Sequence, residues 1–192
     1  MLTLLTLATL SSSPALADST GGVTGTVTAD AAKNLINTVV YVKQGDKGPA
    51  SAKTVRMDQS GLMFMPHVLP IQQGWTVDFY NSDSVGHNVF TMDGEKYDLG
   101  TWPQGEKRSY TFTKPGTYRQ LCRVHDDMLG YIVVLDTARF AISDKDGHFT
   151  LAGLPAGTYT LGVWHEKLAA ADLVVTVTAG KNATVTVPLA AK

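Results

Sequence analysis

The feature that most constrains the fold of this sequence is one short loop carrying Cys122, His125 and Met128. Cys122 is the only cysteine of the chain, so it cannot form an internal disulfide. A thiolate, an imidazole and a thioether are soft or borderline donors, and together they suit copper better than other common metals. A mononuclear site of this kind needs a second imidazole, which His87 can supply from an upstream segment. We therefore expect a fold that brings two distant segments together.

Each of these residues also has an ordinary structural interpretation. Cys122 alone is compatible with an inert buried side chain, and a lone histidine such as His87 is usually structural. Zinc is disfavoured because methionine is a rare zinc ligand. A Cys–His nucleophile pair is disfavoured because catalytic pairs are usually brought together by the fold, and no third orienting group is evident. We predict a copper site in which Cys122 binds as a thiolate, His87 and His125 bind as neutral imidazoles, and Met128 is the weak axial ligand.

The first residues have the pattern of a secretory signal. A short apolar run at 2–10 is followed by Ala15-Leu16-Ala17, a small-x-small cleavage sequence. We expect residues 1–17 to be a signal peptide and the mature chain to be periplasmic or secreted. The apolar run is too short to span a bilayer, so no membrane insertion is expected after cleavage. An unused thiol is a liability in an oxidising compartment, which favours a metal-ligand role for Cys122.

The charge balance narrows the class of partner. The 16 basic and 17 acidic residues nearly cancel, at a net charge of −1. Nucleic acids and anionic membranes both select a basic surface, so neither is expected as a partner.

Short β-rich segments separated by glycine and proline turns predict an all-β chain, and no amphipathic helix pattern is convincing. Strands at this spacing form a sandwich or barrel. The pattern changes after Ala138, where the remaining ~55 residues are marginal for an independent core. The expected strands are 23–28, 38–42, 53–57, 62–68, 75–80, 87–92, 107–113, 117–122, 131–135, 139–143, 148–152, 158–164, 172–178 and 183–189.

Residues 51–136 resemble the cupredoxins, most closely their amicyanin and plastocyanin branch. The matching pieces are Gly74-x-Thr76-Val77-x-Phe79-x-Asn81-x-Asp83, His87-Asn88-Val89, Pro115-Gly116-Thr117-Tyr118, Cys122-x2-His125-x2-Met128 and Gly130-x-Ile132-Val133-Val134. This resemblance implies a Greek-key sandwich, one type 1 (blue) copper ion and electron transfer to redox partner proteins through the edge of His125. It also implies that Asn88 braces the cysteine-bearing strand. Asp126 departs from the pattern, since relatives commonly carry proline there, but this change removes no ligand.

The C-terminal part, residues 137–192, resembles the carboxypeptidase regulatory-like, or transthyretin-like, domain. The matching pieces are Asp146-Gly147-x-Phe149-x-Leu151-x2-Leu154-Pro155-Ala156-Gly157-x-Tyr159-x-Leu161. That domain normally opens with two strands that this part lacks, and residues 22–27 and 38–42 look like them. We therefore expect residues 18–50 and 137–192 to form one smaller β-sandwich, with the cupredoxin domain inserted between its second and third strands. The alternative makes residues 18–50 extra strands of the cupredoxin.

Met63, Met65 and His67 alternate along one expected strand and would share one face. They could form an accessory Cu(I) site or line the copper pocket, although flexible methionine more commonly fills a core. The sequence assigns no role to His67. We expect His148 to be an exposed strand residue and His165 to be structural.

The sequence thus predicts an exported type 1 copper protein that carries single electrons and is not an enzyme. Copper oxidases and nitrite reductases need further copper centres, with more histidines than the five present. One alternative is a periplasmic copper-binding or trafficking protein without redox turnover. Another is a structural or adhesion β-sandwich protein, against which the four ligands argue. Proteins of this type are sometimes labelled methylamine-utilisation proteins, but no residue here identifies an amine dehydrogenase as partner.

Overall fold

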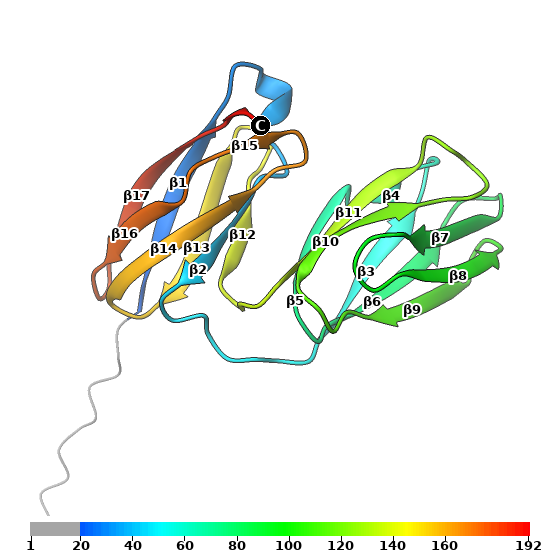
Figure 1. The fold of residues 1–192 in the computed structure, drawn as a ribbon, viewed down its shortest axis with the longest axis horizontal. Coiled ribbons are helices and arrows are strands. Elements are labelled where there is room, and N and C mark those ends of the chain that lie inside the picture. Colours follow the sequence, from blue (N-terminus) through cyan, green and yellow to red (C-terminus); the bar gives the residue numbers. More distant parts are fainter. Residues whose placement is uncertain (1–19) are drawn as a thin grey trace, which may run out of the picture.

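The computed structural model describes residues 20–192, so the expected signal peptide at 1–17 lies outside the described part. The described residues form two β-sandwiches that lie side by side (Figure 1). The all-β prediction is confirmed, and among residues 20–192 the one short helix is the 3-10 turn η1 (Ala32–Asn34). Within residues 20–192, no helix combines the length and the apolar character needed to cross a membrane.

One sandwich, called the terminal sandwich here, contains the first two strands and all strands after Asp136. Its two main sheets have the orders β13-β1-β17 and β12-β2-β14-β16, and β15 and β18 form a small additional pair. β1 pairs antiparallel with β13 and parallel with β17, and β2 pairs antiparallel with β12 and β14. The strands are β1 (Gly21–Thr28), β2 (Val39–Gln44), β12 (Phe140–Ile142), β13 (His148–Leu154), β14 (Gly157–Trp164), β15 (Leu168–Ala169), β16 (Leu173–Val177), β17 (Asn182–Pro188) and β18 (Ala190–Ala191).

β1 lies between two strands from the far end of the chain, β13 and β17. Its valines and threonines occupy opposite faces of the strand. Val23 and Val27 point into the core, whereas the threonines are less buried. Leu151, Leu154 and Leu161 of β13 and β14 complete this core. In Figure 1 the N-terminal strands, in blue, lie among the yellow, orange and red strands of the C-terminal part.

The other sandwich, called the central sandwich here, lies between β2 and β12 in the chain. Its sheets have the orders β5-β11-β10-β7-β8 and β4-β3-β6-β9. Aromatic side chains, among them Phe79, Trp102 and Phe112, fill the space between them. The strands are β3 (Thr54–Gln59), β4 (Phe64–Met65), β5 (Val68–Gln72), β6 (Thr76–Asn81), β7 (His87–Thr91), β8 (Tyr97–Trp102), β9 (Lys107–Thr111), β10 (Gly116–Leu121) and β11 (Leu129–Leu135).

The prediction of one strand over 62–68 is wrong. Only Phe64 and Met65 of this segment form β4, and Val68 already belongs to β5, which pairs with a different sheet. Met63, Met65 and His67 therefore do not alternate along one strand. The expectation that these methionines fill a core is also wrong, because Met63 is 56% exposed and Met65 is 48% exposed.

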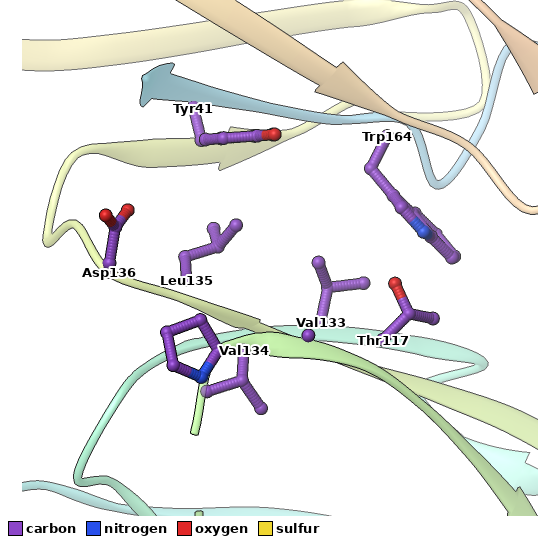
Figure 2. Close-up of a pocket in the computed structure, with 9 residues that line it drawn as sticks. Tyr41, Thr117, Val133, Val134, Leu135, Asp136 and Trp164 are labelled. Carbon is purple, nitrogen blue, oxygen red and sulfur yellow. The ribbon is translucent and has the colours of Figure 1, made fainter. Parts of the chain in front are cut away.

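A small apolar cluster joins the two sandwiches. Val39 of the terminal sandwich packs with Val133 and Leu135 of the central sandwich, and Trp164 packs against their edge. Figure 2 shows the cavity of about 330 Å³ beside this contact, with Tyr41 and Trp164 on one side and β11 on the other. The two sandwiches therefore share a packed boundary.

Candidate metal centre

The predicted ligands meet at one end of the central sandwich. His87 begins β7, and Cys122 directly follows β10. β7 and β10 are antiparallel neighbours paired at Phe90 and Leu121, so the start of one strand lies beside the end of the other. His125 is in the loop between β10 and β11. The distant segments are thus brought together by strand pairing.

Three donor atoms converge in this end of the sandwich. The Nδ1 atoms of His87 and His125 each lie 4.0 Å from the Sγ atom of Cys122, and 3.2 Å from each other. All three atoms lie within 4.8 Å of one another. Two imidazole nitrogens and a thiol that face a common point can hold one metal ion. The donor types suit copper.

Burial differs among the four predicted ligands. His87 is fully buried, and Cys122 and Met128 are 5% and 1% exposed. Met128 packs in the same core cluster as Cys122, and its backbone N–H donates to the carbonyl of His125 at 3.1 Å, which closes the loop. His125 is only half-buried. Of these four side chains, His125 is therefore the one that reaches solvent.

Asp83 fixes the orientation of His87. Its Oδ2 atom lies 2.8 Å from Nε2 of His87, which places the ring proton on Nε2 and leaves Nδ1 free to bind a metal. The same carboxylate accepts the backbone N–H groups of Gly61 and Leu62 at 2.7 and 2.9 Å. The bond from Leu62, with those from Gly61 and His87, holds the pKa of Asp83 below its usual value. Sequence reasoning placed Asp83 in a motif without giving it a role; its position four residues before His87 was the available signal.

Asn88 connects the two ligand-bearing segments, as the sequence predicted. Its side-chain Oδ1 accepts the backbone N–H of Arg123 at 3.3 Å, and its Nδ2 donates to Asp98 and to the carbonyl of Gly100. Its own backbone N–H donates to the Sγ atom of Cys122 at 3.5 Å. This contact links the first strand residue after His87 directly to the sulfur atom of Cys122.

The remaining histidines lie elsewhere. His165 is buried in the terminal sandwich, where its Nδ1 accepts the backbone N–H groups of Lys167 and Leu168. This arrangement bears out the structural role expected for it. His148 is an exposed residue of β13 near Thr26. His67 lies at the boundary between the sandwiches, where its Nε2 is 3.1 Å from Oε2 of Glu166.

Comparisons with known proteins agree with the two resemblances seen in the sequence. Residues 51–135 match the model of the copper binding proteins of the plastocyanin/azurin family. Residues 130–190 match the model of the carboxypeptidase regulatory-like domain.

Solved structures similar to the chain include copper proteins. A Cu-containing nitrite reductase (NirK) from Thermus scotoductus SA-01 is 33% identical, with a TM-score of 0.41; the match covers 43% of this chain but only 22% of the reductase. A mutant amicyanin in its Cu(I) form is 26% identical over 43% of this chain and 82% of its own, with a TM-score of 0.41. A reduced mutant amicyanin is 22% identical over 50% of this chain and 98% of its own, also at 0.41. The two family models show that the chain is similar to copper binding proteins of the plastocyanin/azurin family over residues 51–135 and to the carboxypeptidase regulatory-like domain over residues 130–190.

Proposed function

We propose that this chain is a type 1 copper protein that carries single electrons and has no enzymatic activity of its own. The ligands are His87, Cys122, His125 and Met128. The observation that carries the proposal is the convergence of two Nδ1 atoms and one Sγ atom within 4.8 Å of one another. Copper bound by these donors supplies the Cu(II)/Cu(I) couple.

The protein groups around the ligands suit rapid electron transfer. Asp83 holds the ring of His87, and Asn88 ties the segment after Cys122 to β7. Ligands held in this way keep nearly the same positions in both oxidation states, so little rearrangement accompanies each transfer. The half-buried ring of His125 provides the route to the surface, and its neighbour Val124 is 51% exposed. This apolar side chain beside His125 is available for brief contacts with redox partner proteins, the donor and the acceptor.

The domain division belongs to the same proposal. Residues 18–50 and 137–192 form one carboxypeptidase regulatory-like sandwich, and the cupredoxin domain at 51–136 is inserted into it. The pairing of β1 with β13 and β17 supports this division over the alternative in which residues 18–50 extend the cupredoxin. The terminal sandwich then serves as a stabilising or docking module. With residues 1–17 removed as a signal peptide, the mature chain acts in the periplasm or outside the cell.

A copper titration tests the proposal. Visible absorption and electron paramagnetic resonance would follow addition of Cu(II) to the mature chain and to Cys122→Ser. We expect an intense blue or green charge-transfer band at one equivalent, absent from Cys122→Ser and bleached reversibly by a mild reductant. A weak tetragonal Cu(II) signal, the same in both proteins, would refute the type 1 site. Slow reduction with tight retention of Cu(I) would instead indicate a copper-binding or trafficking protein.

A further inference from the structure

A second concave site lies beside the metal-binding loop. It has a volume of about 310 Å³ and lies between the segment around β4 and the residues that flank Met128. Phe64 forms part of its wall and also packs in the core cluster that contains Cys122 and Met128. The lining residues are Leu62, Met63, Phe64, Met65, His67, Asp127 and Leu129.

The two methionines of this pocket are unusual in their exposure. Met63 is 56% exposed and Met65 is 48% exposed, so neither thioether is used to fill the core. Leaving two large apolar side chains in water contributes little to folding. Thioethers are soft donors that select monovalent copper over harder cations. Two of them on one pocket wall, on either side of Phe64, therefore suit a ligand role.

His67 adds an oriented nitrogen donor. Its Nε2 lies 3.1 Å from Oε2 of Glu166, a residue of the terminal sandwich, and its ring packs edge-on against Tyr131 at a centroid distance of 5.5 Å. The carboxylate places the ring proton on Nε2, and within residues 20–192 no hydrogen bond engages Nδ1. A histidine held by a carboxylate through one nitrogen, with the other free, is the usual arrangement of metal-ligating histidines.

We propose that Met63, Met65 and Nδ1 of His67 form a second copper site that binds Cu(I). Asp127 lies at the same pocket and adds a negative charge that favours a cation there. Nothing in this site involves Cys122, so it does not depend on the electron-carrier function. Because Glu166 comes from the terminal sandwich, the site also gives that sandwich a part in copper binding.

The test measures Cu(I) binding to the full mature chain without oxygen, in competition with bicinchoninate. We expect wild type to bind two equivalents and the double variant Met63→Leu/Met65→Leu to bind one, with its Cu(II) charge-transfer band unchanged. Met92→Leu is the matched control, because Met92 is also 56% exposed but lies outside the pocket; it should keep both equivalents. Glu166→Gln should weaken only the second equivalent, by about 10–100-fold.

Methionine methyl signals in nuclear magnetic resonance separate this site from the main centre. In Cys122→Ser, Cu(I) should shift the methyl signals of Met63 and Met65 and leave Met92 unchanged. These shifts are expected even if the charge-transfer band of wild type were absent, so the two proposals can fail separately. Binding of the same number of Cu(I) equivalents by wild type and the double variant would overturn the second site. So would unshifted Met63 and Met65 signals at saturating Cu(I).

Discussion

Replacing Asp83 by asparagine should weaken copper binding without removing a ligand. The carboxylate accepts three hydrogen bonds, from Gly61, Leu62 and His87. Asparagine keeps one oxygen, and its amide nitrogen would face a donor. Loss of a partner that orients a metal-binding histidine typically lowers metal affinity by about 10–100-fold, which corresponds to ~1.4–2.8 kcal/mol. The backbone N–H groups of Gly61 and Leu62 are exposed, so water can replace a lost acceptor, and the unfolding free energy of the metal-free protein should fall by only ~0.5–1.5 kcal/mol.

The assay is competition of the protein with a Cu(II) chelator, together with urea denaturation of the metal-free form. Asp93→Asn is the matched control, because Asp93 also accepts three hydrogen bonds, all from Arg119, but lies beyond the other end of β7. We expect Asp93→Asn to lower stability and to leave copper affinity unchanged. Equal copper affinities for wild type and Asp83→Asn would refute the orienting role of Asp83.

The pH dependence of stability provides an independent check. The hydrogen bonds from Leu62, Gly61 and His87 lower the pKa of Asp83 in the folded state. A carboxyl whose folded pKa is depressed stabilises the protein above its unfolded value, near 3.9, and this stability is lost as pH falls through the folded value. Below about pH 4, the unfolding free energy of Asp83→Asn should therefore fall less steeply than that of wild type. Parallel curves would contradict the assignment.

Two further substitutions test the packing and hydrogen bonding around the loop that carries Cys122, His125 and Met128. Gly130→Ala should lower the unfolding free energy by ~1–3 kcal/mol in urea denaturation, because the added Cβ would lie 2.7 Å from Cβ of buried Phe64; an unchanged midpoint would contradict this. Asn88→Ala leaves the backbone N–H of Arg123 without its acceptor. This substitution should lower the unfolding free energy by ~1–3 kcal/mol and speed the loss of copper to a chelator. A rate of copper loss equal to that of wild type would show that the hydrogen bond does not restrain the loop.

Strands with a clear period of two could be predicted from the sequence, whereas β5, β8 and the two-residue strands β15 and β18 could not. β1 and β10 were predicted to within one or two residues because their more buried and less buried residues alternate. β5 contains Pro70 and ends at a turn, so its sequence predicts a loop between strands rather than a strand. β8 contains Asp98 and Gly100, which disfavour a strand. Both are stabilised by pairing with a neighbour, β11 and β7 respectively, which local sequence does not encode.

The candidate ligands could be named from the sequence because three of them, Cys122, His125 and Met128, are close in sequence and chemically distinctive. Apart from Asn88, the groups that orient the candidate donors could not. Glu166 and His67 are 99 residues apart, and their hydrogen bond depends on how two sandwiches pack. Met63 lies directly before β4, so its exposure depends on where that strand begins, and no pattern of residue types marks that point. Sequence reasoning therefore finds donors more readily than the contacts that orient them.

The strand that follows the loop with Cys122, His125 and Met128 is buried on both faces, which predicts that the central sandwich depends on the terminal sandwich. Along β11, Ile132 and Val134 face the core of the central sandwich, while Val133 and Leu135 pack against Val39 across the boundary. This alternation means that residues 51–136 alone would expose two apolar side chains of β11 to water. We expect this fragment to bind a hydrophobic dye and to unfold at lower urea concentration than the full chain does. A fragment as stable as the full chain, with no dye binding, would show that the boundary contributes nothing to the metal-binding part.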